Sequence, residues 1–222
     1  MNRILIIVNT IIFVVYFLST EGILLSTQFA AVMEQEFIMV PNNVLQGQQL
    51  YTLLTSMFMH ANWLHLIGNM IFLYVFGDNV EDIFGHIGYL IFYIFCGLVA
   101  AVSYILVNLY APLISATIGI PIASDLTSGV LGASGAIAGV LGAYIALFPK
   151  AKVISFVFFV ILPIPAFIFL GVWFLLQWVY WVTDISSGVA YVAHIGGFIA
   201  GIVLALAIGL RRKKLRNARL RL

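Results

Sequence analysis

The chain has 222 residues, of which 64% are hydrophobic and 8% are charged, and its formal net charge is +2. Soluble domains carry about 25% charged residues, and a core of this size cannot hide so much apolar surface from water. The composition therefore excludes a soluble domain and predicts an all-α polytopic membrane protein. The single cysteine, Cys96, cannot form an intrachain disulfide, and we expect it to pack inside the helix bundle.

Hydropathy and helix-breaking residues divide the chain into six predicted spans that form one domain, residues 1–222. The spans are Ile4–Thr20, Trp63–Gly77, Ile87–Tyr110, Ser134–Phe148, Pro163–Val182 and Tyr191–Leu210. No small-residue cleavage pattern follows the first apolar stretch, so we interpret it as a retained helix rather than a signal peptide. The segment Glu21–His60 is too polar to span and too apolar for a free linker, which predicts a loop on the membrane surface. A second loop, Pro112–Gly129, is expected between the third and fourth spans.

The placement of charged residues supports six spans. With both termini on one side, all 10 Lys and Arg residues fall on that side, which their excess predicts to be cytoplasmic. The opposite side receives only acidic residues, namely Glu21, Glu34, Glu36, Asp125 and Asp184. Residues 211–222 form a basic cytoplasmic tail, which we interpret as a stop signal that also contacts anionic lipid. We do not expect it to bind nucleic acid.

Ser134 opens the fourth span, and His194 lies near the start of the sixth. Counting back from Pro149 at about 1.5 Å per residue places Ser134 roughly 22 Å above the inner face of the membrane. The same count from Arg211 places His194 roughly 25 Å above that face. The two side chains are therefore expected at matching depth. Non-helical backbone before Ser134 is tolerated in a membrane only beside protein or water, which predicts a cavity that opens to the outer face.

Small residues predict that these two spans approach each other closely. Both spans have small-xxx-small spacing, with Gly135 and Gly139 in the fourth and Ala193, Gly197 and Gly201 in the sixth. Glycines at this spacing often do no more than pack a helix bundle. The matching depth of the serine and the histidine favours a shared site instead.

A hydroxyl beside an imidazole can carry out acyl transfer. Serine is a poor nucleophile until a base takes its proton, and a neutral imidazole can take that proton and return it to a leaving amine. We expect Asp184 to border a loop rather than to join the pair, so the pattern predicts a dyad of Ser134 and His194. Because Ser134 begins a helix, the amides of the first turn lack intrahelical partners and are expected to contribute to an oxyanion hole.

The second span carries two further polar side chains, His65 and Asn69, which share one helix face. Polar groups at such depth are costly unless they face a cavity or a partner. A metal site is an alternative, but no carboxylate or thiolate joins His60 and His65 at the same level, so none is predicted. We expect His60 to orient the surface segment and His86 to be solvated in a turn.

At these residues the chain resembles the rhomboid intramembrane proteases. The resemblance runs from about Tyr51 to Gly201 and rests on three motifs in a fixed order. They are an HxxxN pair (His65, Asn69), a GxSG sequence (Gly132 to Gly135) and a His-x-Gly-Gly sequence (His194 to Gly197).

The resemblance implies a six-helix bundle, a first loop half in the membrane and a fifth helix that moves aside to admit substrate. It implies that Ser134 is the nucleophile, that His194 is the general base, and that His65, Asn69 and the Ser134 amide bind the oxyanion. The implied activity is that of a serine endopeptidase, without metal or cofactor, which cuts the transmembrane or juxtamembrane region of membrane proteins through an acyl-enzyme. Six spans without a further domain suggest a minimal prokaryotic form in the plasma membrane.

The chain departs from the family pattern at two places. Many members carry Trp-Arg before the Leu-Leu-Thr stretch of the first loop, where this chain has Tyr51-Thr52. This difference alters how the surface loop is held. Some members place an aromatic ring four residues after the serine to stack on the histidine, where this chain has Ala138. His194 is then expected to lean on another ring, from the second or fifth span.

Two other functions fit a membrane protein of this composition. A catalytically inactive rhomboid-like protein would bind membrane clients with the same fold, but its usual mark is a missing serine or histidine, and both are present. A small-solute transporter would also bury polar residues, but the chain has no two-fold repeat of hydropathy and no pair of matched broken helices.

Overall fold

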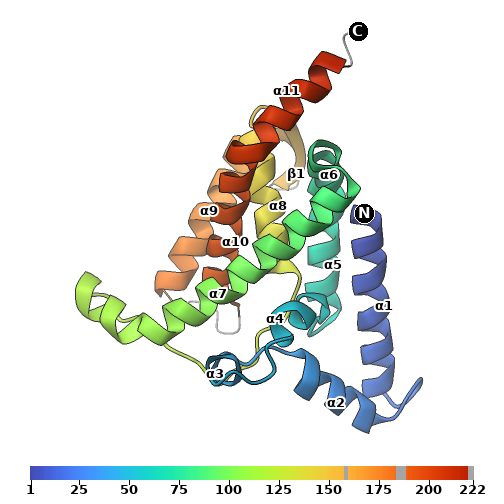
Figure 1. Cartoon of the computed structure of the whole chain (residues 1–222), viewed down its shortest axis with the longest axis vertical. Helices are drawn as coiled ribbons and strands as arrows, with labels where there is room; N and C mark the ends of the chain where they lie inside the picture. Colours follow the sequence, from blue (N-terminus) through green and yellow to red (C-terminus); the bar gives the residue numbers. More distant parts are fainter. Residues whose placement is uncertain (158–159, 184–188, 220–222) are drawn as a thin grey trace.

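The computed structural model describes the chain except for residues 158–159, 184–188 and 220–222. Its long helices form a bundle, and the short helices of residues 27–55 gather at the end opposite the C-terminal tail (Figure 1). The elements before the fourth predicted span are α1 (Asn2–Thr20), α2 (Thr27–Phe37), α3 (Pro41–Leu45), α4 (Thr52–Thr55), a 3-10 turn (Ser56–Phe58), α5 (Trp63–Phe72), a π-helical turn (Leu73–Gly77), α6 (Asp78–Phe84) and α7 (His86–Ile118). From the fourth predicted span onward, the elements are α8 (Ser134–Leu147), β1 (Lys152–Val157), β2 (Val160–Pro165), α9 (Ala166–Thr183), α10 (Tyr191–Leu204), a second π-helical turn (Ala205–Gly209) and α11 (Leu210–Arg219).

Each of the six predicted spans corresponds to a helical segment. In the described part of the chain, four helices are long and apolar enough to cross a membrane: Asn2–Thr20, His86–Ile118, Ala166–Thr183 and Tyr191–Arg216. The second span is covered by α5 and the π-helical turn, after which the helix continues as α6, and the fourth is covered by the shorter apolar helix α8. The prediction of an all-α membrane bundle is confirmed.

The third helix is longer than predicted. Pro112 lies inside α7, which continues to a left-handed cap at Gly119, so the prediction of a loop from Pro112 was wrong. A proline inside a helix cannot donate to the carbonyl four residues earlier, here that of Asn108. That carbonyl instead accepts a hydrogen bond from the Ser124 hydroxyl at 2.8 Å, and the Asn108 side-chain oxygen accepts one from the Asp125 amide at 2.9 Å. The helix therefore passes the proline because the following loop satisfies the group that the proline leaves free.

The sequence pattern did not predict the hairpin before α9. Strands β1 and β2 pair antiparallel, with Lys152 opposite Pro165. The hairpin leads directly into α9, which begins at the residue after β2. The amide of that first residue, Ala166, donates to the carbonyl of Ala151 at 2.8 Å and so joins the start of α9 to the chain before β1.

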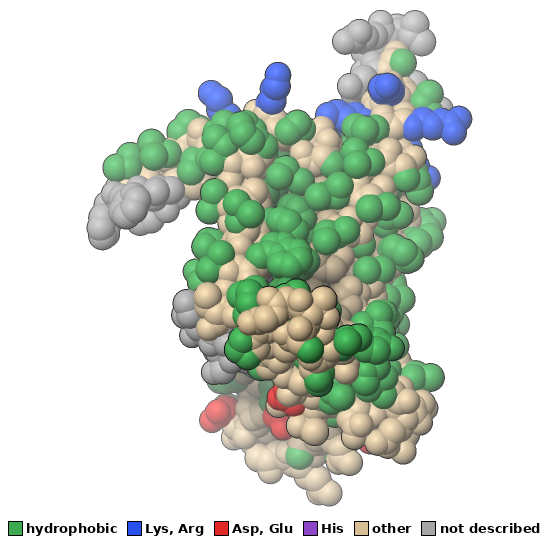
Figure 2. Space-filling model, turned by 90° about the vertical axis from the view of Figure 1, so that its left-hand side faces the viewer, with side chains coloured by type: hydrophobic (Ala, Val, Ile, Leu, Met, Phe, Trp, Pro, Cys, Tyr) green, Lys and Arg blue, Asp and Glu red, His purple; other side chains and the backbone are tan. Residues whose placement is uncertain are grey.

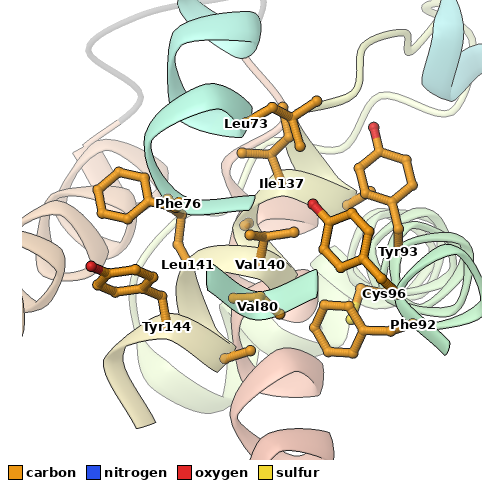
Figure 3. Packing of buried hydrophobic residues seen from close by; sticks show 14 of the residues in the cluster. Leu73, Phe76, Val80, Phe92, Tyr93, Cys96, Ile137, Val140, Leu141 and Tyr144 are labelled. Atoms are coloured by element: carbon orange, nitrogen blue, oxygen red, sulfur yellow. The ribbon is translucent and has the colours of Figure 1, made fainter. Parts of the chain in front are cut away.

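Helix α8 lies at the centre of the bundle. Ten of its residues are buried, and its side chains pack against the second span and α7 in the cluster of Figure 3. Cys96 of α7 is fully buried there and is a free thiol, which confirms its predicted packing role. A side chain at Gly139 would come within 2.4 Å of the Cys96 Cβ atom, so this contact requires glycine.

Helices α8 and α10 touch through the predicted small residues. A Cβ atom on Gly197 would lie 2.1 Å from the Gly135 carbonyl oxygen, and one on Gly201 would lie 1.9 Å from that of Gly139. The backbones therefore approach as closely as glycine permits. This contact sets the spacing between the start of α8 and the start of α10.

The surface loop is held by side chains from its own segment. Tyr51, which stands where many similar proteins have tryptophan, donates its hydroxyl to Glu36 of α2. The Thr55 hydroxyl donates to the Phe37 carbonyl at 3.1 Å. Met39 pairs with Val130 in a β-bridge, which joins the surface loop to the chain that leads into α8.

Basic side chains gather at one end of the long axis of the molecule. On the face shown in Figure 2, the blue Lys and Arg side chains lie at the end that carries the C-terminal helix, and the visible red Asp and Glu side chains lie at the opposite end. The body between them is covered with exposed hydrophobic side chains. This distribution agrees with a bundle whose middle faces lipid.

Candidate active site

Ser134 is recessed because its helix is short. Helix α8 begins at Ser134 and has 14 residues, which gives a length of about 21 Å, against about 30 Å for a bilayer core. The serine therefore lies below the level that a full span would reach, as the count along the sequence predicted.

The structure brings the predicted serine and histidine together. The Ser134 Oγ atom lies 2.8 Å from the Nε2 atom of His194, which belongs to the first turn of α10. Both residues are half-buried. A hydroxyl in this position can pass its proton directly to the imidazole.

The second ring nitrogen of His194 contacts a residue that the sequence analysis did not single out. Its Nδ1 atom lies 2.8 Å from the side-chain oxygen of Gln177 in α9. The Trp173 ring, one turn earlier in α9, lies 6.0 Å from the His194 ring between centroids. The ring expected from the second or fifth span in place of Ala138 thus comes from the fifth. The sequence could have indicated Gln177 as a site residue, because a side-chain amide in an otherwise apolar span needs a buried hydrogen-bond partner.

The two residues predicted as oxyanion donors lie on the second span beside Ser134. His65 and Asn69 both line the cavity that contains Ser134. The Asn69 Nδ2 group donates to the Nε2 atom of His60 at 3.0 Å. A side-chain amide has two N–H donors, so the second remains for another acceptor. His60 is fully buried, and it therefore positions Asn69 in addition to its predicted place in the surface segment.

Gly132 permits the close approach of His65 to the serine segment. Its φ is +123°, a left-handed conformation that side chains rarely adopt. A Cβ atom there would lie 2.8 Å from two ring atoms of His65. The Gly132 amide donates to the Ser56 carbonyl at 2.9 Å, which ties the segment to the surface loop.

The site occupies a cavity of about 910 Å³. Its lining extends from Ser134 and His194 to two loop residues, the half-buried Asp125 and the exposed Ser128. Trp173 also lines it, so α9 forms one wall. The cavity is large enough to hold several residues of an extended peptide.

Asp125 holds the loop at the mouth of this cavity. Its carboxylate accepts hydrogen bonds from the Ser128 amide and from the amide and hydroxyl of Thr127, each at 2.9 Å. These bonds from Ser128 and Thr127 favour the ionised form and hold the pKa of Asp125 well below its usual range.

Other polar residues that the sequence singled out lie away from the serine. His86 contacts the Glu81 carboxylate at the end of the molecule that carries the basic tail. Asp184, expected to border a loop, lies outside the described residues. Within the described ranges, no group of three or more His, Cys, Asp or Glu side chains is placed to hold a metal ion.

The fold and the site define an all-α membrane protein with a serine–histidine pair recessed inside its helix bundle. A family model for the Rhomboid domain matches residues 47–211. This match covers most of the chain, and the chain belongs to the rhomboid family.

Curated relatives support this assignment. The chain is 31% identical over 166 residues to RHOMBOID-like protein 12, mitochondrial, of Arabidopsis thaliana, which covers 74% of this chain and 48% of that protein. It is 30% identical over 177 residues to Rhomboid protein 1, mitochondrial, of Saccharomyces cerevisiae, which covers 76% of this chain and 45% of that protein. A shorter match, 47% identical over 47 residues, covers 21% of this chain and 17% of Rhomboid-like protein 11, chloroplastic, of Arabidopsis thaliana. The chain thus spans about half the length of the first two relatives.

These relatives correct one prediction. The six-span layout suggested a prokaryotic plasma membrane and the charge bias suggested cytoplasmic termini, but the matched relatives are mitochondrial and chloroplastic proteins of eukaryotes. That location was wrong. It failed because neither a count of spans nor a charge bias identifies which membrane holds the helices.

Proposed function

We propose that this chain is an intramembrane serine endopeptidase with a Ser134–His194 dyad. Rhomboid family members act on membrane-protein substrates within the bilayer, and membership supports either a protease or a rhomboid-like protein without activity. The observation that favours the protease is the 2.8 Å contact between Ser134 Oγ and His194 Nε2. An inactive client-binding protein has no need of this pair, and no observation favours that alternative.

The proposed reaction follows from this geometry. His194 Nε2 takes the hydroxyl proton while Ser134 Oγ attacks the carbonyl carbon of the scissile bond. The protonated imidazole then gives its proton to the leaving amine, and an ester to Ser134 remains. A water molecule, deprotonated in turn by His194, hydrolyses this ester and releases the second product.

The developing oxyanion needs donors on the side of α8 that faces the second span. The first-turn amides of α8 point toward the start of the helix, where its positive dipole end also lies. His65 and the second N–H of Asn69 add side-chain donors from the wall opposite. One well-placed donor of this kind contributes about 10²- to 10³-fold to kcat.

The substrate that suits this cavity is a segment of a membrane protein near the end of its transmembrane helix. The site lies below the end of the bundle and is surrounded by lipid-facing helices, so a substrate can reach it sideways from the bilayer. The organellar relatives support a eukaryotic organellar membrane as the location, which imaging of the tagged chain with organelle markers would test.

Labelling with a fluorophosphonate tests the proposal. We expect detergent-solubilised protein to be labelled at Ser134, as located by mass spectrometry, and Ser134→Ala to remain unlabelled. Ser19→Ala is the matched control, because the Ser19 hydroxyl lies in α1 and bonds the Val15 carbonyl at 2.7 Å. Equal labelling of Ser134→Ala and the unmodified protein would exclude the proposed nucleophile.

A second variant tests the base. His194→Ala should abolish cleavage of a model transmembrane substrate while circular dichroism reports an unchanged helix content. Turnover near that of the unmodified protein would show that another group takes the proton.

A further inference from the structure

Gln177 is a buried polar residue on a helix that otherwise faces lipid. Among the described residues of α9, the buried ones are Ala166, Leu170 and Gln177, and the glutamine is only 5% exposed. Burying an amide without hydrogen-bond partners is unfavourable. Both ends of its side chain are paired, so its contacts identify its role.

The contacts of Gln177 fix the orientation of its amide. The Nε2 group lies 3.1 Å from the backbone carbonyl oxygen of Trp173, one turn earlier in the helix. A carbonyl oxygen can only accept, so the NH₂ group must lie on that side. The side-chain oxygen therefore faces His194 Nδ1, at 2.8 Å.

This orientation determines which nitrogen of His194 carries the proton. The Gln177 oxygen can only accept a hydrogen bond, so it favours the tautomer with the proton on Nδ1. The lone pair is then on Nε2, which faces Ser134 Oγ at 2.8 Å. This is the tautomer that can accept the serine proton.

We propose that Gln177 is a positioning residue that holds His194 in its basic tautomer, an inference that rests on the proposed serine protease function. In the described part of the site, the hydrogen-bond acceptor for His194 Nδ1 is this amide oxygen from α9 and not a carboxylate. The Trp173 ring of the same helix lies next to the imidazole. Because a hydrogen bond weakens steeply beyond about 3.5 Å, a shift of α9 by about 1 Å breaks this contact. The readiness of the base thus depends on the position of the helix that walls the cavity.

Three variants test this role by the rate of Ser134 labelling and by kcat and KM for a transmembrane substrate. Gln177→Leu keeps the size of the side chain and removes the acceptor. Gln177→Glu keeps an acceptor oxygen. Leu176→Ala is the matched control, because Leu176 is the preceding residue and its side chain is 39% exposed.

We expect Gln177→Leu to lower the labelling rate and kcat about 10- to 100-fold with KM nearly unchanged. A wrong histidine tautomer in a serine protease triad costs about 10⁴-fold, and the loss of an uncharged partner should cost less. Gln177→Glu should restore most of the rate. It should also move the acid limb of the pH profile to higher pH, because a carboxylate stabilises the imidazolium form.

The unmodified protein offers a measurement that needs no variant. In ¹⁵N spectra of histidine-labelled protein, His194 should carry its proton on Nδ1. A proton on Nε2 would overturn the proposal, as would a Gln177→Leu protein with an unchanged labelling rate and pH profile, or an equal loss in Leu176→Ala. These outcomes are distinct from failure of the protease assignment, which is decided by labelling of Ser134→Ala alone.

Discussion

At the scale of single residues, the site depends on a glycine as much as on its polar side chains. Gly132 combines a left-handed backbone with contact to the His65 ring, so a side chain there conflicts with both. Residues forced into rare backbone regions cost about 1–3 kcal/mol. The clash in addition displaces the His65 ring from its place in the site.

Gly132→Ala is therefore expected to lower the labelling rate of Ser134 at least about tenfold, because a displaced His65 no longer supports the oxyanion. Gly119→Ala is the control, since Gly119 has φ +71° but no atom within 4 Å of the added Cβ. It carries the backbone strain alone, so it should lower the thermal midpoint without changing the labelling rate. If both variants label like the unmodified protein, the contact with His65 has no part in the reaction.

The oxyanion role predicts a specific kinetic effect at Asn69. Asn69→Ala should lower kcat about 10²- to 10³-fold with little change in KM, because the donor acts on charge that develops only in the transition state. Asn79→Ala, an exposed amide farther along the same helical segment, should leave both constants unchanged. A rise in KM with kcat unchanged in the Asn69 variant would indicate substrate binding instead.

At the scale of elements, the spacing of α8 and α10 sets the distance between nucleophile and base. Gly201→Ala places a Cβ atom 1.9 Å from the Gly139 carbonyl oxygen, so the two backbones must separate. Overpacking of this kind costs about 1–3 kcal/mol, which corresponds to a fall of roughly 2–12 °C in the thermal midpoint for a chain of this size. Gly171→Ala, in α9 with no atom within 4 Å of the added Cβ, should not lower the midpoint. Equal midpoints would mean that the helices are not closely packed.

The sequence predicted the relative positions of residues in these helices well, because the rise per residue of a helix links residue number to position. The rise of a helix is fixed, so counting from Pro149 and Arg211 predicted Ser134 and His194 at matching depth, and their side chains meet at 2.8 Å. The extension of α7 past Pro112 could not be predicted, because it depends on Ser124, a residue distant in sequence that bonds the freed carbonyl. The contact between His194 and Gln177 was not predicted, because residue spacing within a helix does not show which faces of α9 and α10 meet.

At the scale of the whole molecule, Glu81 of α6 binds the start of α1 at the end that carries the basic residues. The Glu81 carboxylate accepts from the Met1 amine at 2.5 Å and from the Asn2 amide at 2.7 Å, and it also contacts His86. Glu81 is buried, so these charged contacts are little screened by solvent.

Glu81→Ala should therefore destabilise the protein by about 3 kcal/mol, because it leaves buried donors without an acceptor. Asp82→Ala removes an exposed pair with Arg216, whose atoms lie 2.9 Å apart, and exposed pairs contribute about 0–1 kcal/mol. Thermal unfolding in detergent compares the two variants. A larger loss of stability in Asp82→Ala than in Glu81→Ala would contradict the prediction that the buried contacts of Glu81 contribute more.

The hydrogen bonds that Asp125 accepts in the loop after α7 also keep a negative charge at the mouth of the cavity. Because Ser128 and Thr127 keep the Asp125 carboxylate ionised, its charge persists into acid conditions where an ordinary aspartate is neutral. Substrates whose flanking residues are Lys or Arg should then be drawn to the mouth and acidic flanks repelled. This preference should fade in about 1 M salt, where the screening length falls to about 3 Å. If the proposed function holds, the charge of this turn should therefore influence which substrate chains reach Ser134.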